Sequence, residues 1–117
     1  MDPRAALAAE RERAVTAVLA LTDDLAQMIA AAESSNADDE HDPEGATIAW
    51  ERAQVSALLD QARRRVIDVE RALQQVGEGT YGRCLSCGRP IGTERLAARP
   101  ASRTCISCAA AAPSGRR

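Results

Sequence analysis

The stretch Tyr81–Cys108, YGRCLSCGRPIGTERLAARPASRTCISC, contains all four cysteines of this 117-residue chain. They form two Cys-x-x-Cys pairs, Cys84/Cys87 and Cys105/Cys108, with seventeen residues between the pairs. A zinc ion takes four ligands at the corners of a tetrahedron, and each Cys-x-x-Cys turn supplies two thiolates. Gly88, directly after the first pair, suits such a tight turn. The spacing therefore predicts one zinc ion bound by all four cysteines.

We expect this zinc ion to be structural, because four thiolates leave no coordination position for water. The only histidine, His41, lies far upstream. Two disulfides would suit a secreted domain, but no signal peptide is recognisable, and we expect a soluble, cytoplasmic protein. A dithiol redox pair needs only one Cys-x-x-Cys, in a βαβ context that is not found around either pair. Oxidised or redox-active cysteines are thus the weaker interpretation.

Two long helical segments precede the cysteines. The first is expected from Pro3, with Asp2 as its cap, to about Ala32, and the second from about Pro43 to Val76. Apolar residues recur in both at steps of three and four, interrupted only at Arg11, which is the pattern of a helix with one buried stripe. The stripe residues are Leu7, Ala14, Val18, Leu21, Leu25, Met28 and Ala32 in the first helix, and Val55, Leu59, Ala62, Val66, Val69, Leu73 and Val76 in the second.

The segment between the helices, residues 33–45, reads ESSNADDEHDPEG and has six acids and no arginine or lysine. Its proline and glycine stop a helix and favour a turn. A short connection favours antiparallel neighbours, so the stripes are expected to pack together, with Val18 opposite Leu59 and Ala62. A parallel homodimeric coiled coil is the alternative, but it would not explain two matching stripes that flank one turn. We therefore expect a monomer.

The predicted fold is mainly α: an antiparallel two-helix coiled-coil hairpin with an acidic tip, plus a small four-cysteine zinc finger. Residues 1–77 would form the hairpin, with its tip at about 33–45, and residues 78–112 the finger, in which 105–112 could be a short helix. Residues 113–117 are expected to be a disordered tail. No run of eighteen apolar residues occurs, so no membrane segment is expected.

Charge is divided unevenly along the chain. Residues 1–77 carry fifteen acids against eight arginines, and residues 78–117 carry two acids against seven arginines. Four thiolates on one zinc ion add about two negative charges, so the finger is less basic than this count indicates. The acidic body argues against general DNA binding, which draws on a basic surface to neutralise phosphates, and no sequence-specific DNA binding is expected.

The stretch from Gly79 onward, GTYGRCLSCGRPIGTERLAARPASRTCISC, resembles the DksA/TraR C4-type zinc-finger proteins of bacteria. Their finger has an aromatic residue and a glycine before the first cysteine pair, Cys-Gly after it, then Ile-Gly, Arg-Leu, Ala-x-Pro and a closing Cys-Ile-x-Cys. The positions that match are Tyr81-Gly82, Cys87-Gly88, Ile91-Gly92, Arg95-Leu96, Ala98-Arg99-Pro100 and Cys105-Ile106. A helical hairpin with an acidic tip is also the architecture of this family.

The resemblance implies that the partner is RNA polymerase. Proteins of this family insert their coiled coil into the secondary channel of the polymerase, so that acidic tip residues approach the catalytic centre. By this resemblance the chain would regulate transcription initiation without being an enzyme. Two other functions are kept open: a zinc-stapled protein-interaction adaptor with an inert tip, and a thiol switch that releases zinc on oxidation.

The tip departs from the family pattern Asp-x-x-Asp-x-Ala. Counted back from the cysteines, Glu44-Gly45-Ala46 stands at Asp-x-Ala, with His41 at the first aspartate. A shift by one residue restores Asp42 but places Gly45 at the second aspartate and Thr47 at the alanine. A solvated acidic turn without a binding role is the alternative. The predicted partner-binding residues of the tip are Asp39, Asp42, Glu44 and Ala46.

Several other side chains have two interpretations. Trp50 is expected to face outward near the tip, where it would either anchor a partner or cover the flank of the first helix. Arg52 falls on the stripe near the apex and is expected to loosen the packing. The run 63–65 of three arginines would be solvated or pair with Glu10 and Glu12 across the hairpin, and a contact with the polymerase is the alternative. Arg95 would dock the finger on an acidic surface or brace it internally.

Overall fold

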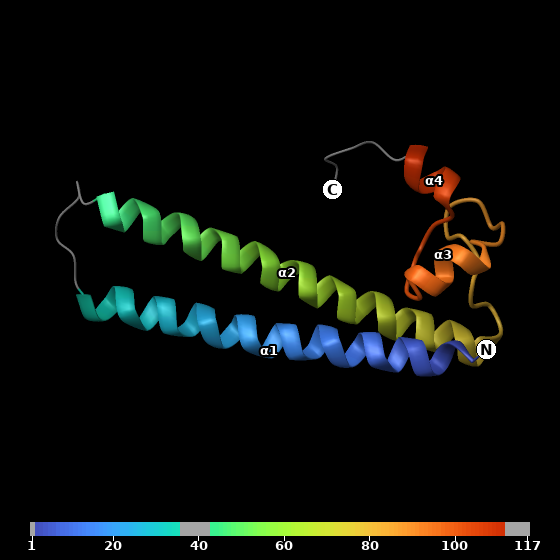
Figure 1. Ribbon diagram of the computed structural model, residues 1–117, viewed down its shortest axis with the longest axis horizontal. Helices are drawn as coiled ribbons and strands as arrows, with labels where there is room; N and C mark the ends of the chain where they lie inside the picture. The colour runs from blue at the N-terminus through green and yellow to red at the C-terminus, as the bar shows by residue number, and fades with distance from the viewer. Residues whose placement is uncertain (1, 36–42, 112–117) are drawn as a thin grey trace. The chain divides into compact units, whose positions relative to one another are not determined.

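The computed structural model describes residues 2–35 and 43–111, and this part of the chain folds into four helices (Figure 1). The helices are α1 (Pro3–Ser35), α2 (Pro43–Glu78), α3 (Thr93–Ala98) and α4 (Ile106–Ala111). The one β pairing in the described residues is a single bridge between Arg83 and Pro90. The predicted mainly helical fold is confirmed.

The ends of the long helices follow local sequence signals. The backbone N–H of Arg4 donates to Oδ1 of Asp2 at 3.0 Å, which is the predicted cap of α1. At the end of α2, the N–H of Gly79 donates to the carbonyl of Val76, and the N–H of Thr80 to that of Gln75. This pair of bonds satisfies carbonyls that a helix end would otherwise leave free. α2 therefore runs slightly beyond its predicted end.

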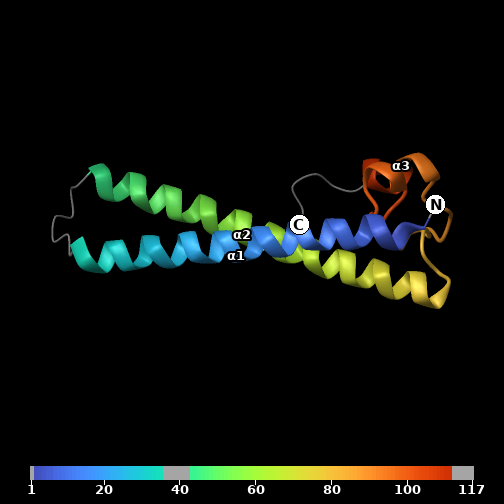
Figure 2. The same cartoon turned by 60° about the horizontal axis from the view of Figure 1, so that its bottom comes forward.

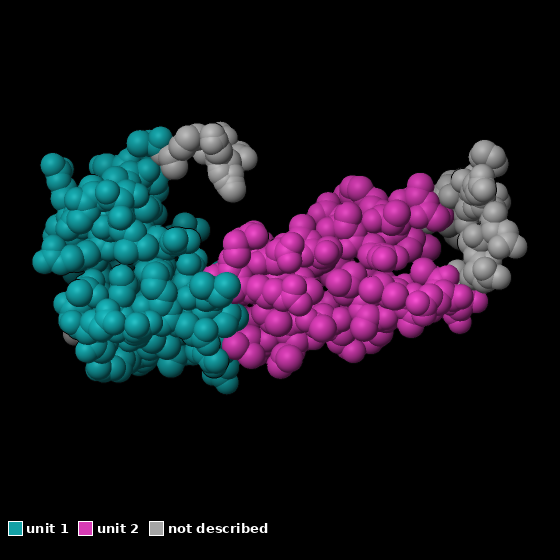
Figure 3. All heavy atoms as spheres, turned by 180° about the vertical axis from the view of Figure 1, so that it is seen from behind, with its two compact units in different colours: residues 1–12, 65–117 teal, residues 13–64 magenta. Residues whose placement is uncertain are grey.

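The chain divides into two compact units, residues 1–12 with 65–117, and residues 13–64 (Figure 3). Within each unit, the segments of α1 and α2 lie side by side and run in opposite directions (Figures 1 and 2). The predicted packing of two long helices in an antiparallel hairpin is thereby confirmed. We call the first group the base unit and the second the apical unit.

The base unit contains the larger helical core. Leu7, Val69 and Ala72 are fully or almost fully buried there. They are packed against Leu73, Val76, Tyr81 and Ala101. Because a buried Leu or Val side chain contributes about 1.5–3 kcal/mol, this cluster is a main source of stability in the base unit.

Charged pairs on the surface of the base unit join the two helices. Nη2 of Arg11 lies 3.0 Å from Oε2 of Glu70. The predicted pairing between the arginine run and Glu10 is found for Arg65, at 3.9 Å. Exposed pairs of this kind contribute at most about 1 kcal/mol each, so they add less than the apolar cluster. In the apical unit, Arg63 lies near Asp60 of its own helix.

The apical unit is packed more loosely. Its buried residues are Ala14, Leu59 and Ala62, among the part of the chain that the structure describes. The predicted stripe residues between Val18 and Met28 are half-buried, and every residue from 45 to 54 is exposed. The stripe is correct in register, but small side chains and one arginine leave it incompletely filled.

An open groove of about 340 Å³ results in the apical unit. Its lining residues are Leu25 and Ile29 from α1 and Ala49, Arg52, Ala53 and Ser56 from α2. Since Leu25 and Ile29 share this groove with Ala49 and Ala53, the antiparallel register brings Val18 level with Leu59–Ala62, as predicted. Arg52 occupies the stripe position at which an aliphatic side chain would close the groove.

Replacing Arg52 with leucine should stabilise the protein. The new side chain would bury apolar area against Leu25 and Ile29, and we expect a gain of about 0.5–1.5 kcal/mol in the free energy of unfolding. Urea denaturation followed by circular dichroism measures this gain. Arg64→Leu is the control, since Arg64 is exposed and lies off the stripe. An equal gain in the control would mean that the effect does not come from the groove.

The segment Pro3–Ser34 of α1 is long and apolar enough, by length and composition, to cross a membrane, with a mean hydropathy of 1.4 in its best window. One helix near the N-terminus that meets this test is weak evidence, because a packed helix of a soluble protein can meet it too. Asp23 and Asp24 interrupt the apolar run, and α1 pairs with α2 in both units. The absence of a membrane segment stays a prediction.

Candidate metal centre

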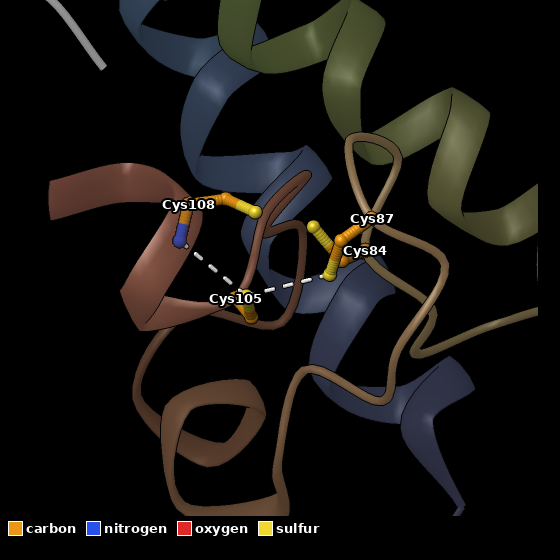
Figure 4. Close-up of side chains that lie close together, drawn as sticks. All are labelled: Cys84, Cys87, Cys105 and Cys108. Atoms are coloured by element: carbon orange, nitrogen blue, oxygen red, sulfur yellow. Dashed lines mark hydrogen bonds between the residues drawn. The ribbon is translucent and has the colours of Figure 1, made fainter. Parts of the chain in front are cut away.

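The four cysteines meet at one point in the base unit. Their sulfur atoms all lie within 4.8 Å of one another, and those of Cys87 and Cys105 are 3.9 Å apart. Figure 4 shows the four side chains turned toward one another, two from the loop after α2 and two from the start of α4. A tetrahedral zinc ion at ~2.3 Å from each thiolate needs sulfurs about 3.8 Å apart. The predicted ligands therefore fit one zinc ion.

Backbone hydrogen bonds shape each Cys-x-x-Cys turn. The N–H of Gly88 donates to the carbonyl of Cys84 at 2.9 Å, and the N–H of Ala109 donates to that of Cys105 at 2.9 Å. Gly88 has a φ of 78°, a left-handed conformation that costs glycine little. This confirms the turn predicted for that glycine. Each turn is thus closed by the chain itself.

N–H groups pointing at sulfur prepare the site for negative charge. Burial alone would raise the pKa of the Cys84 thiol, but N–H groups of Cys105, Cys87 and Ser86 lower it to about 6. The pKa of Cys105 is lowered, chiefly by the N–H of Cys108, which lies 3.5 Å from its sulfur. These backbone N–H groups stabilise the thiolate form of Cys84 and Cys105 without a metal.

The last proton is held more tightly. The neighbouring thiols, Cys105 first, raise the pKa of Cys108 to about 12. Four adjoining thiolates repel one another, so a divalent cation is needed to ionise the full set. Binding of zinc must therefore release protons. The donor set is four soft sulfurs with no histidine or carboxylate, which is the composition of a structural zinc site.

The ligands are also most of the core of the finger. Its buried residues are Cys84, Ile91 and Cys105, with Leu96 and Cys108 packed against them. Three of these five side chains are zinc ligands. Such a small apolar cluster cannot offset the entropy of ordering about thirty residues, so the metal contributes directly to folding.

A strap of residues 99–104 joins the metal centre to α2 within the base unit. Nη2 of Arg71 donates to the carbonyl of Ala101 at 2.9 Å, and the hydroxyl of Tyr81 donates to that of Pro100 at 2.7 Å. Arg103 lies 3.7 Å from Asp68. Burial lowers the pKa of Arg71 and Asp68 raises it. The strap leads directly into Cys105, so its contacts with Arg71 and Asp68 connect α2 to a metal ligand.

These contacts were not anticipated from the sequence. Arg71 and Asp68 lie off the apolar stripe of α2, and their partners are about thirty residues further along the chain. In the sequence, Tyr81 stands out only as part of the family pattern. No periodic signal marks an arginine that binds a distant backbone carbonyl, so a folded structure was needed to find it.

The predicted partner-binding residues are placed as follows. Asp39 and Asp42 lie outside the described residues, and so does the side chain of Glu44, while Ala46 is exposed on α2. Trp50 is 62% exposed, which favours the outward orientation over cover for the flank of α1. Nε of Arg95 donates to the carbonyl of Thr104 at 2.8 Å, so this side chain braces the finger. A binding role for each of them stays a prediction.

Gly82 is a position at which a side chain should damage the finger. Its φ is +91°, and a Cβ there would lie 3.3 Å from Cδ1 of Leu96. We expect Gly82→Ala to lower the free energy of unfolding by about 1–3 kcal/mol. The control is Gly77→Ala at the end of α2, where nothing lies within 4 Å and alanine should be neutral or stabilise by up to about 1 kcal/mol. A chelator titration followed with a zinc indicator should show that Gly82→Ala releases zinc at a lower chelator concentration than Gly77→Ala. Equal release of zinc by the two variants would contradict the prediction.

Known proteins resemble one segment of this chain in sequence and most of the chain in fold. Residues 79–113 match the family of the prokaryotic DksA/TraR C4-type zinc finger. The protein named RNA polymerase-binding transcription factor DksA is 41% identical over 49 residues in Escherichia coli K12 and in Salmonella typhimurium, a match that covers 42% of this chain and 32% of the relative. DksA of Caulobacter vibrioides is 40% identical over 50 residues, covering 43% of this chain and 35% of the relative.

A solved structure resembles more of the chain. Transcription factor DksA2 from Pseudomonas aeruginosa superimposes with a TM-score of 0.70 and 23% identity, over 92% of this chain and 78% of that one. At this identity the likeness establishes the fold alone. The sequence match, in contrast, spans about a third of the length of the curated relatives. Residues 79–113, which match the family of the DksA/TraR C4-type zinc finger, contain all four cysteines, and their clustered sulfurs fit one structural zinc ion.

Proposed function

We propose that this protein is a bacterial transcription regulator that binds RNA polymerase and acts through the acidic tip of its hairpin. The observation that carries the proposal is the 41% identity over 49 residues to RNA polymerase-binding transcription factor DksA. The DksA2-like fold over 92% of the chain supports it. The protein would act in the cytoplasm as a monomer, without enzymatic activity and without sequence-specific DNA contacts.

The charge of the apical unit suits a tip that enters a channel. Residues 13–64 carry ten acids against four arginines. Carboxylates crowded at the end of a hairpin repel each other and gain from a basic or Mg²⁺-containing environment. In the described residues, the cysteine cluster is the one group of side chains able to hold a metal. Four protein ligands leave no coordination position for a substrate or water, so the metal would be structural and not catalytic.

Binding is the first test of this proposal. Zinc-loaded protein should bind purified RNA polymerase core at micromolar concentration or below, and a known secondary-channel factor should displace it. Fluorescence anisotropy of a labelled protein measures both. The absence of binding at micromolar concentration would overturn the proposal.

The tip should be needed for the effect on transcription but not for binding. We expect Asp42→Asn with Glu44→Gln to keep affinity for the polymerase within about threefold and to abolish the change in initiation at a single promoter. Removal of two tip charges costs little in affinity if most contacts lie elsewhere. In vitro transcription measures the effect.

The matched control for this variant is Asp23→Asn with Asp24→Asn, which removes two charges from α1 and should retain activity. If the tip variant regulates as well as the natural protein, its carboxylates form only a solvated turn. The protein would then be a protein-interaction adaptor with an inert tip.

A further inference from the structure

The groove of the apical unit (magenta in Figure 3) is a short trough between the two long helices. Each helix lines it with two apolar residues, Leu25 and Ile29 from α1 and Ala49 and Ala53 from α2. The two residues of each pair are about one helical turn apart, or roughly 6 Å along the helix axis. Its volume of about 340 Å³ is within the range of protein binding sites, so the trough has room for one bulky side chain.

Arg52 is the one charged residue among those that line the groove. The residues three and four positions away from it on α2 are all uncharged, so an ion pair along that helix cannot form. Leu25 and Ile29, which face it from α1, are apolar. In the part of the chain that the structure describes, the Arg52 side chain makes no hydrogen bond or ion pair. The groove therefore contains a guanidinium whose N–H donors are available to a ligand.

The position of Arg52 on the apolar stripe is unfavourable for the hairpin itself. A leucine there would close the groove and bury more apolar area. A residue that breaks the pattern of its segment without a gain in stability is expected at functional sites. The guanidinium is a planar fork that binds a carboxylate through two parallel N–H···O bonds. A carboxylate beside an apolar group is thus the ligand chemistry that this groove fits.

The charge and the openness of the apical unit restrict which molecule can bring that carboxylate. Residues 13–64 carry ten acids against four arginines, so a second copy of this chain or a strongly acidic segment would be repelled. A small molecule would leave much of its surface in water, because the groove is open. A protein segment that is otherwise neutral or basic, with one carboxylate about one helical turn from an apolar side chain, matches both the trough and its surroundings.

We propose that the apical groove binds such a segment of a partner protein, with its aliphatic or aromatic side chain in the trough and its carboxylate against Arg52. The inference rests on the proposed function, in which the segment belongs to RNA polymerase. It assigns to the flank of the hairpin a contact of its own, made by different residues from the carboxylates of the tip. Ser56, one turn from Arg52, also lines the groove and offers a hydroxyl to the backbone of the segment.

The first experiment measures the affinity of zinc-loaded variants for RNA polymerase core by fluorescence anisotropy. Arg52→Leu should weaken binding about tenfold, although the same change should stabilise the protein. Arg52→Lys keeps the charge but not the fork and should weaken binding about threefold. Ala53→Leu fills the trough, leaves Arg52 in place and should weaken binding about tenfold. The control is Arg64→Leu, which removes the same charge from an exposed position off the stripe and should change affinity less than twofold.

The second experiment identifies what occupies the groove. The photo-crosslinking residue p-benzoylphenylalanine replaces Ser56, and the cross-linked peptide of the polymerase is sequenced. It should contain Asp or Glu within about one helical turn of an aliphatic or aromatic residue. A cross-linked peptide without a carboxylate would overturn the inference. Sedimentation of the natural protein alone tests the second copy, since a dimer that disappears in Arg52→Leu would also overturn it.

The inference and the proposed function fail in different ways. Natural affinity for the polymerase in both Arg52→Leu and Ala53→Leu would overturn the inference and leave the proposed function intact. If the natural protein itself fails to bind, both fail together. A loss of affinity in Arg52→Leu cannot come from weaker folding if urea denaturation shows that this variant is the more stable protein.

Discussion

Cys84→Ser should abolish zinc binding and unfold the finger, the largest effect that we expect from a single substitution. Zinc in small four-ligand sites contributes on the order of 10 kcal/mol to folding, and the loss of one thiolate should lower affinity roughly a thousandfold or more. Without the metal, the finger keeps Ile91 and Leu96 as its main apolar contacts. These cannot hold residues 79–111 in one conformation.

Limited trypsin digestion measures this unfolding directly, because three of the five arginines in the finger are not followed by proline and can be cleaved. Cleavage after Arg83, Arg95 and Arg103 should become rapid in Cys84→Ser, whereas Arg89 and Arg99 precede prolines and stay uncut. Metal analysis should show less than one zinc ion per chain. The control is Ser86→Ala, which changes a residue between the two ligands of the same turn. It should retain one zinc ion and stay resistant to trypsin. A Cys84→Ser protein that still holds a full zinc ion would show that the four sulfurs are not one site.

Much of the hairpin should survive loss of the finger, since its stripes pack together without the metal. Helicity at 222 nm should fall only modestly, because α3 and α4 have six residues each. The base unit would lose the packing of Tyr81 and Ala101 on its helical core. We therefore expect a lower midpoint of thermal unfolding for the remaining helices.

Leu7→Ala should destabilise the base unit by about 2.5–4 kcal/mol. Leu7 is fully buried against Val69 and Ala72, and truncation leaves a cavity as well as losing apolar burial. The apical unit buries few side chains, so its packing cannot make up for the stability that the base unit loses. Urea denaturation, followed at 222 nm, measures the change.

Leu19→Ala is the matched control on the same helix. Leu19 is 67% exposed, so the same truncation should change the free energy of unfolding by less than about 0.5 kcal/mol. Comparable losses in the two variants would mean that Leu7 does not lie on the buried stripe. A clear difference between the two losses would confirm in solution that Leu7 lies on the buried stripe between the two helices.

The sequence was most informative where the governing chemistry is local. Two Cys-x-x-Cys pairs predicted the metal ligands, because each turn must present two sulfurs to one ion and only four cysteines exist. The helices and their stripes followed from a repeat of three and four residues. Asp2 and Pro43 indicated where the two long helices begin, since a cap and a first helical position depend on neighbouring residues.

Sequence patterns could not give the depth of burial along the stripe. Ala14 and Ala62 are buried, whereas Leu25 and Met28 are only half-buried, although their larger apolar side chains would be expected to be buried first. Burial depends on what faces each position across the seam. Small residues and Arg52 face Leu25, and the groove remains open as a result.

By itself the sequence determined the zinc ligands, the two long helices and their antiparallel register, because each depends on spacing within a short segment or between matching stripes. Only the tertiary structure revealed the strap that ties Arg71 to the carbonyl of Ala101 and the exposure of Leu85 and Ile106 beside the metal centre. Such contacts form between segments far apart in the chain. They depend on how those segments pack, which no local repeat specifies.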